Sequence, residues 1–313
     1  MAKNEYVRDG QITDFNDLFE LAEDKKPVIW VAGFRVKKDF VRPAAFFLQW
    51  SLAKLRNTQL YRAKKSNMEL KVLNSNSQGN CYLLVGRDEV LIIEAGIKFS
   101  EVKKALNYNI GNIVGCLITH EHNDHAGCYL EYLEYGFPVL SPEAVYKNKG
   151  NAAMLPFAKV VQPGKGYKVG NFKVISFEVQ HDVPALGYQI DHPDMGRLIF
   201  LTDTFYCEYT FDNVTTWLIE ANYADDILDR NIADGRMPPS MRSRLLKSHM
   251  ELETTKGILR VNDLTNTQNI VLIHLSDGNS DETRFVREIA GLTGKPTIAA
   301  KKGVELWIGK LPY

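Results

Sequence analysis

Short apolar runs that alternate with polar residues follow one another from about residue 68 onward, and they predict β-strands separated by helices. The strand-like runs are residues 71–73, 82–85, 90–94, 113–119, 172–179, 197–201, 216–220, 269–273 and 304–308. Apolar positions with helical spacing lie at residues 100–106, 124–135, 251–261 and 281–292. Sheets of this kind need helices to cover them, so the pattern predicts a mixed α/β fold.

The first 68 residues have a different texture. Residues 27–34 read as one short strand, and Pro43 can open a helix that runs to about residue 55, because proline fits the first helical turn. A basic stretch at residues 64–67 then gives way to the strand pattern. We therefore expect a basic and aromatic N-terminal extension, residues 1–68, followed by a larger domain, residues 69–313.

The composition is that of an ordinary globular protein. With 313 residues, 45% of them hydrophobic and 24% charged, the chain is unlike disordered, collagen-like or disulfide-scaffold proteins. Its four cysteines form no Cys-x-x-Cys pair and read as reduced thiols. No secretory signal begins the sequence, and no window has the roughly 18 apolar residues that would span a membrane. These features predict a cytoplasmic protein.

A dense group of metal-binding residue types follows the strand-like run 113–119. Residues 119–127 read Thr-His-Glu-His-Asn-Asp-His-Ala-Gly, and their candidate ligands are His120, His122, Asp124 and His125. A loop between a strand and a helix lets such side chains converge on one point. Imidazole nitrogens and carboxylate oxygens are suitable ligands for a divalent metal. The alternative, a solvated polar loop, is improbable for this pattern.

Together with Glu94-Ala95-Gly96 at the end of the preceding strand, the motif resembles the metallo-β-lactamase superfamily. The resemblance implies an αββα sandwich that binds two divalent metal ions, zinc in the first place and manganese in the second. It implies that His120, His122 and His181 hold one metal, that Asp124, His125 and His274 hold the other, and that Asp203 bridges them. Taken alone, His181 or His274 could be a structural hydrogen-bonding residue. His192 belongs to no motif and is expected at the surface.

Further motifs are similar to those of one branch of the superfamily, the YycJ-like (WalJ-like) exonucleases, which are relatives of ribonuclease Z. The motifs are Leu-Asn-Ser-Asn-Ser-Gln-Gly-Asn-Cys-Tyr at 73–82, Thr-His-Glu-His at 119–122, Leu-Thr-Asp-Thr at 201–204, Ile-Glu-Ala-Asn-Tyr at 219–223, Ser-His-Met at 248–250 and His-Leu-Ser-Asp-Gly-Asn at 274–279. Zinc β-lactamases place Cys where Asp203 stands. Glu94 departs from this branch, which has Asp there, and a role in orienting the ligands is expected for it. Met-Glu-Leu-Glu after His249 is a second departure.

The likeness to ribonuclease Z implies an extra histidine, paired with an acid, beside the scissile phosphate. His249 and Glu220 are the candidates, since an imidazolium held by a carboxylate can stabilise phosphoryl charge and protonate the leaving oxygen. Asp124 joins them among the catalytic residues as a metal ligand, not as a free base. The alternatives are a residue at a helix N-terminus for His249 and a strand-end acid for Glu220. The turn at 75–80 could form an anion-binding nest or a plain hairpin turn.

The sequence thus predicts a dinuclear phosphodiesterase that hydrolyses nucleic acid, as a nuclease or exonuclease, through a metal-bridging hydroxide. A cyclic-nucleotide phosphodiesterase, a glyoxalase-II-like thioester hydrolase and a metal-stabilised nucleic-acid-binding module remain alternatives. The expected partner is nucleic acid or a nucleotide, no membrane is involved, and a homodimer is an open option.

Charge is unevenly distributed although the formal net charge is +0. Residues 33–65 contain nine Lys and Arg and only one acid, so the rest of the chain is correspondingly acidic. Aromatic residues are interleaved with this basic run, a composition that can bind phosphates and stack on bases. The alternative is a small amphipathic subdomain whose charges are solvated.

Overall fold

The computed structural model describes residues 68–148 and 156–311, together with the backbone of four short strands near the N-terminus. These are β1 (Val7–Arg8), β2 (Gln11–Ile12), β3 (Ile29–Val31) and β4 (Phe34–Val36). β3 and β4 pair antiparallel, so the single strand predicted over 27–34 is wrong. The helix predicted over 43–55 lies outside the described residues. Two compact units, Met1–Arg56 and Asn57–Tyr313, make up the chain. The domain boundary at residue 68 stays a prediction.

The first large sheet has seven strands in the order β10-β9-β8-β7-β6-β5-β18. Its strands are β5 (Glu69–Asn76), β6 (Gly79–Val85), β7 (Val90–Ile93), β8 (Ile113–Leu117), β9 (Val139–Ser141), β10 (Ala158–Val160) and β18 (Glu305–Trp307). Strands β7 to β10 run parallel to one another, whereas β5, β6 and β18 pair antiparallel. The carboxyl ends of the parallel strands therefore meet at one edge.

The second large sheet also has seven strands, in the order β11-β12-β13-β14-β15-β16-β17. Its strands are β11 (Gly166–Val169), β12 (Phe172–Val179), β13 (Ala185–His192), β14 (Gly196–Leu201), β15 (Val214–Glu220), β16 (Asn269–Ile273) and β17 (Thr297–Ala299). Strands β14 to β17 are parallel and β11 to β14 antiparallel. Both sheets therefore present a set of parallel strand ends.

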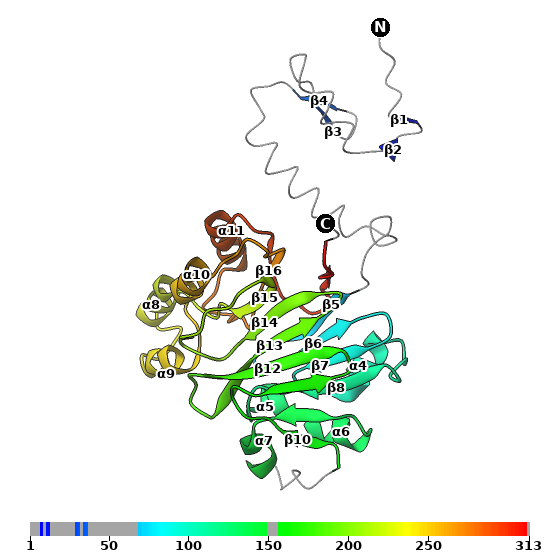
Figure 1. Ribbon diagram of the computed structural model, residues 1–313. Coiled ribbons are helices and arrows are strands. Elements are labelled where there is room, and N and C mark those ends of the chain that lie inside the picture. Colours follow the sequence, from blue (N-terminus) through cyan, green and yellow to red (C-terminus); the bar gives the residue numbers. More distant parts are fainter. Residues whose placement is uncertain are drawn as a thin grey trace. The chain divides into compact units, whose positions relative to one another are not determined.

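Helices cover the outer face of each sheet (Figure 1). On the first sheet lie α4 (Phe99–Ala105), α5 (Asn123–Ala126), α6 (Tyr129–Glu134) and α7 (Glu143–Asn148), and on the second lie α8 (Asp225–Ala233), α9 (Ser240–Ser248), α10 (Leu252–Val261) and α11 (Glu282–Thr293). The strands alternate accordingly: Leu198 and Phe200 of β14 join the core between the sheets, whereas Ile199 and Leu201 join the core under the helices. This period-2 alternation creates the predicted αββα sandwich.

The core between the sheets fixes their spacing. Tyr82 of the first sheet contacts Phe200 of the second edge to face, with ring centroids 5.4 Å apart. Leu84 and Ile93 lie in the same buried cluster as Leu198. Because interiors of this kind are close-packed, a change of sheet spacing would open voids throughout the cluster.

Most predicted elements are present, with instructive differences. The helix predicted over 124–135 is broken into α5 and α6, and Gly127 and Cys128 lie between them. A Cβ at Gly127 would lie 2.3 Å from the carbonyl oxygen of Asn123. The sequence did not predict strands β9, β10, β11, β13 and β17 or helix α7, and it did not predict helices α8 and α9. The two helices carry charged residues on several sides and therefore lack a wide apolar stripe.

A buried polar contact joins the two sheets through their loops. Glu89, between β6 and β7, accepts hydrogen bonds from Asn171 N (2.8 Å) and Asn171 Nδ2 (2.9 Å), which belong to the second sheet's β11–β12 turn. His192 Nε2 lies 2.9 Å from Glu89 Oε1. His192 is buried, so the expectation that it lies at the surface is wrong. The contact with Glu89, 103 residues away in the sequence, is the physical reason for its burial.

We predict that Glu89→Gln lowers the free energy of unfolding at pH 7 by about 2 kcal/mol, because hydrogen bonds to a buried carboxylate are lost. Burial disfavours the charged form, but the hydrogen bonds from Asn171 and His192 outweigh burial and lower the pKa of Glu89. A lowered pKa gives stability that is present above the unfolded value of about 4.3 and disappears as the pH falls through the folded value. Denaturant titrations should therefore show the difference between wild type and variant shrinking below about pH 4.

The control is Glu305→Gln, which removes an exposed carboxylate that pairs with Lys71 in the same sheet. Its effect should stay within about 0.5 kcal/mol. A Glu89→Gln effect of the same size at pH 3 and pH 7 would contradict the assignment.

Candidate metal centre

Seven predicted ligands converge beside the parallel strand ends of the two sheets. The first sheet supplies the segment after β8 with His120, His122, Asp124 and His125. The second supplies His181 after β12, Asp203 after β14 and His274 after β16. The geometry thus requires both sheets, because neither carries a complete set of donors.

Three residues at these strand ends adopt a left-handed backbone conformation that side chains other than glycine rarely take. Their φ angles are 69° at Glu94, 48° at Asp203 and 54° at His274. Strain of this kind gathers at functional sites, where the surrounding structure enforces it. The turn at each strand end directs the chain across the edge of the sheet at the point where its side chain joins the cluster.

The first group of donors is His120, His122 and His181. His122 Nδ1 lies 3.1 Å from His120 Nε2 and 3.3 Å from His181 Nε2, so three ring nitrogens surround one point. Burial lowers the pKa of His120 well below its ordinary value and also lowers the pKa of His181. Both are therefore kept as neutral imidazoles, the form that binds a metal.

The second group is Asp124, His125 and His274. Asp124 Oδ2 lies 3.3 Å from His125 Nε2 and 3.4 Å from His274 Nε2. Asp203 Oδ2 is 3.1 Å from His125 Nε2, and Asp203 also forms a compact group with His120 and His125. The structure therefore places Asp203 where it adjoins both groups of donors, as the bridging assignment requires.

Hydrogen bonds outside the donor groups orient the rings. Thr119 Oγ1 donates to Glu94 Oε1 (2.7 Å) and lies 2.8 Å from His120 Nδ1, and Glu94 Oε1 is 3.3 Å from His125 Nδ1. On the other sheet, His181 Nδ1 donates to the carbonyl oxygen of Ser248 (2.9 Å). The contacts of His120 and His181 occupy Nδ1 and leave Nε2 facing the centre, which is how partners outside a metal's coordination sphere fix the tautomer. The Glu94 carboxylate approaches His125 Nδ1 as an ion pair and not as a hydrogen bond.

The donor chemistry fits a divalent metal. Four carboxylates gather here: Glu94, Asp124, Asp203 and Glu220. Within the described part of the chain their ion pairs are formed with histidines. Buried carboxylates need compensating positive charge, and mixed imidazole and carboxylate donors suit zinc and manganese. Thus the residues present fit the metals that the resemblance implies.

His249 and Glu220 form the predicted pair. His249 Nδ1 lies 2.8 Å from Glu220 Oε1 and 3.4 Å from Asp203 Oδ1, and its ring stacks on His274 with centroids 5.3 Å apart. Burial opposes protonation, but the Glu220 carboxylate outweighs it, so the pKa of His249 is raised. His249 is the C-cap that follows Ser248, the last residue of α9, and the side chain of Glu251 caps the N-terminus of α10. His249 is therefore not the cap of the helix that follows it.

Two site residues were not singled out from the sequence as contacts of the donors. Asn80 Nδ2 lies 3.1 Å from His125 Nε2, and Asp182 Oδ1 lies 3.1 Å from His181 Nε2. From its sequence, the turn at 75–80 is a candidate anion-binding nest, not a contact of a metal ligand. It forms the β5–β6 hairpin, and a Cβ on Gly79 would lie 2.6 Å from the carbonyl oxygen of Gly96. The signal for Asp182 was its place directly after His181.

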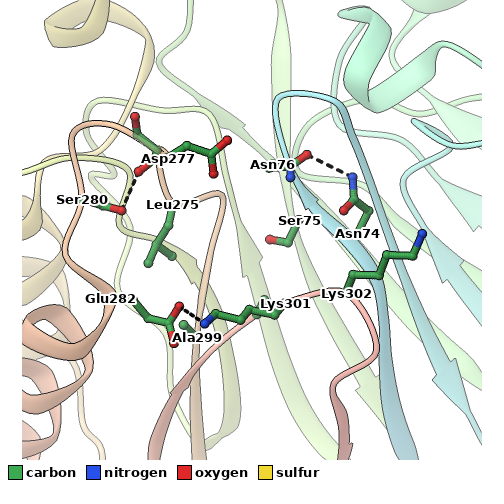
Figure 2. A pocket seen from close by; sticks show the side chains of 12 residues that line it. Asn74, Ser75, Asn76, Leu275, Asp277, Ser280, Glu282, Ala299, Lys301 and Lys302 are labelled. Atoms are coloured by element: carbon green, nitrogen blue, oxygen red, sulfur yellow. Dashed lines mark hydrogen bonds and ion pairs between the residues drawn. The ribbon is translucent and has the colours of Figure 1, made fainter. Parts of the chain in front are cut away.

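A cavity of about 420 Å³ lies next to the site and is lined by Ser75 and Leu275 among others (Figure 2). Its lining includes Ser75, whose hydroxyl accepts a hydrogen bond from His274 N at 3.0 Å. Lys301 Nζ pairs with Glu282 Oε2 at 2.7 Å, and Lys302 and Asp277 add one charge of each sign. The lining contains none of the seven donors, and its balanced charge favours neither an anion nor a cation.

Comparisons with known proteins agree with this geometry. Residues 75–206 match the profile described as "Metallo-beta-lactamase superfamily". The chain is 27% identical over 237 residues to "Exodeoxyribonuclease WalJ" of Streptococcus pneumoniae serotype 2, covering 71% of this chain and 85% of the relative. It is 29% identical over 230 residues to "Exodeoxyribonuclease YycJ" of Bacillus anthracis, covering 69% and 85%. The resemblance drawn from the motifs is confirmed.

Solved structures show the same fold at low sequence identity. The metallo-beta-lactamase fold protein YhfI from Bacillus subtilis is 14% identical, with a TM-score of 0.57 over 77% of this chain and 99% of that chain. Human tRNase Z, short form, is 14% identical, with a TM-score of 0.50 over 77% and 99%. The metallo-β-lactamase fold is therefore confirmed. Among the described helices, none has the length and apolar character needed to cross a membrane.

We predict that Glu94→Gln weakens metal binding by about 10-fold to 100-fold, because Glu94 supports His125 directly and His120 through Thr119. All seven candidate ligands remain in this variant. Competition with a chromogenic zinc chelator at pH 7 measures the affinity. Glu305→Gln is the control, since it alters an exposed glutamate of the same sheet that lies outside the centre and pairs with Lys71. Equal affinities for wild type and Glu94→Gln would refute the supporting role.

Proposed function

We propose that this chain, whose residues 75–206 form a metallo-β-lactamase superfamily domain, is a dinuclear metal-dependent phosphodiesterase that hydrolyses nucleic acid. The observation that carries the proposal is the convergence of two groups of donors on Asp203, with the His249–Glu220 pair at the same carboxylate. Curated relatives named exodeoxyribonucleases favour DNA as the polymer and an exonuclease mode.

In this proposal His120, His122 and His181 would hold one cation, Asp124, His125 and His274 would hold the other, and Asp203 would be the ligand shared between them. Bound there, a pair of divalent cations supplies an activated water and stabilises the charge of the attacked phosphate. Zinc is the first candidate and manganese the second. The protein's part is to fix the donors rigidly, because Thr119, Glu94 and Ser248 orient the rings before any substrate arrives.

His249 has the features of a proton donor to the leaving oxygen. Glu220 holds its Nδ1, so Nε2 is the atom left to face a substrate, and the raised pKa favours the protonated ring. Its side chain is 18% exposed, whereas the side chain of Glu220 is fully buried. In this scheme Glu220 is a positioning residue that keeps the imidazolium oriented.

A substrate panel distinguishes the rival functions. We predict that the protein, loaded with Zn²⁺ or Mn²⁺, hydrolyses DNA and small chromogenic phosphodiesters, and that Asp203→Ala and His120→Ala abolish turnover. Lys173→Ala, which changes an exposed residue of β12, should retain wild-type rates. Cleavage of cyclic nucleotides or thioesters alone would favour the corresponding alternative. Bound metal without turnover would indicate a binding module.

We predict that the effect of His249→Ala depends on the leaving group. Hydrolysis of DNA, which expels an alkoxide, should slow by about 100-fold or more, because proton donation contributes a factor of this order. Hydrolysis of methyl p-nitrophenyl phosphate should slow much less, because p-nitrophenolate needs no proton to leave. Metal content should equal that of the wild type. The same loss for both substrates would rule out proton donation, and loss of metal would make His249 a ligand.

The cytoplasmic location, a homodimer and nucleic-acid binding by residues 1–68 remain predictions of the sequence. The last of these concerns a segment of which only Met68 has a described side chain.

A further inference from the structure

Two adjacent aromatic side chains are exposed next to the metal centre. Phe205 and Tyr206 follow Asp203 by two and three residues, and they are 40% and 52% exposed. Single exposed aromatics are common on protein surfaces. A neighbouring pair at the edge of a catalytic centre is different, because flat exposed rings there can meet the substrate.

Hydrogen bonds anchor this aromatic pair to the segment that carries His181. Phe205 N donates to the carbonyl oxygen of Gln180 (3.2 Å). Thr204 Oγ1 accepts from Gln180 N (3.0 Å) and donates to the carbonyl oxygen of Tyr206 (2.6 Å). The backbone of the pair is therefore held in place, which limits the entropy lost when the rings engage a ligand.

A basic helix reaches the same histidine from another direction. Ser248, the last residue of α9, accepts the hydrogen bond from His181 Nδ1. The side chains of Arg244 and Lys247, three residues apart on α9, are exposed. Arg242 differs from them, because Asp225 and Asp229 bind its guanidinium. Thus α9 brings two solvent-facing cations within about one helical turn of Ser248.

We propose that Phe205, Tyr206, Arg244 and Lys247 form a substrate rim that holds a single strand of nucleic acid beside the metal centre. The aromatic rings stack on unpaired bases, and the two cations contact phosphates that flank the scissile one. The inference rests on the proposed phosphodiesterase function and adds its substrate form. Stacking requires an unpaired base, so the rim favours a single strand over a duplex.

Charge and chemistry point to this occupant. Arginine and lysine contact phosphates, and aromatic faces accept any base, a combination typical of proteins that bind single strands without sequence preference. Asp182 also lies beside His181, with its carboxylate 3.1 Å from Nε2. Asp182 adds negative charge on this side of the centre, so the positive charge that contacts the phosphates comes from Arg244 and Lys247 of α9.

The test measures binding of a fluorescent, nuclease-resistant phosphorothioate DNA strand to the full-length, metal-loaded protein by anisotropy. Phe205→Ala and Tyr206→Ala should each weaken binding by about 10-fold, a typical loss for one stacked base. A strand with abasic sites should bind wild type and these variants equally. Tyr108→Ala is the matched control, because Tyr108 is 69% exposed and precedes β8, whereas the metal centre follows it.

The contribution of α9 appears in the salt dependence. Arg244→Ala and Lys247→Ala should each reduce the slope of log affinity against log salt by about 0.7, the value for one phosphate contact on a single strand. Lys173→Ala, at the far end of β12 from His181, should leave the slope unchanged. Parallel titrations with an RNA strand of the same sequence compare the affinities for DNA and RNA. The polymer that binds more tightly is identified as the preferred substrate.

Unchanged affinity in both aromatic variants, or an equal loss on intact and abasic strands, would overturn the stacking role. Tighter binding of a blunt duplex than of the single strand would overturn the choice of substrate. Turnover of methyl p-nitrophenyl phosphate should be the same in wild type and in the control variants Tyr108→Ala and Lys173→Ala. Failure of the phosphodiesterase proposal would appear instead as absent turnover in the wild type, so the two failures are distinguishable.

Discussion

Mutual repulsion of buried carboxylates is the constraint on which this structure depends. Glu94, Asp203 and Glu220 are buried and the side chain of Asp124 is 21% exposed, so water screens these carboxylates poorly and the group is unfavourable without compensating charge. In the ion pairs that the described residues form here, the partners are imidazoles. Divalent cations bound here would supply the balance more completely. A fold that holds these acids together is therefore one built to hold metal.

Because the donors come from two sheets, the packing between the sheets sets the geometry of the centre. Tyr82 and Phe200 contact each other across the core, and Glu89 of the first sheet's β6–β7 loop contacts Asn171 in the β11–β12 turn and His192 at the end of β13. A shift of about 1 Å between the sheets would misplace His181 relative to His120 by the same amount, which is enough to impair a catalytic site. Residues remote from the chemistry thus determine its precision.

The features predicted correctly from the sequence are those that a local pattern of neighbouring residues determines. Alternating apolar residues located most strands, and the motif at residues 119–127 located the centre, because its ligands are close in the chain. Glu89 and His192 are 103 residues apart in the sequence, and no motif near His192 predicts their contact. Helix α9 was not predicted, because charged residues interrupt its apolar face. Sequence patterns do not reveal which distant segments pair or which isolated polar residues are buried. Both depend on contacts that only the folded structure shows.

Glu94, Asp203 and His274 have a left-handed backbone conformation, which costs stability for any residue other than glycine or asparagine. Keeping these side chains there therefore implies a functional need for them. Glycine or asparagine would relax the local strain at each one, so a copy of this protein released from its task would gain stability by accepting either residue. A chain that keeps a carboxylate or an imidazole at all three positions gives up that stability. These three φ angles therefore offer a way to distinguish working members of a lineage from decayed ones.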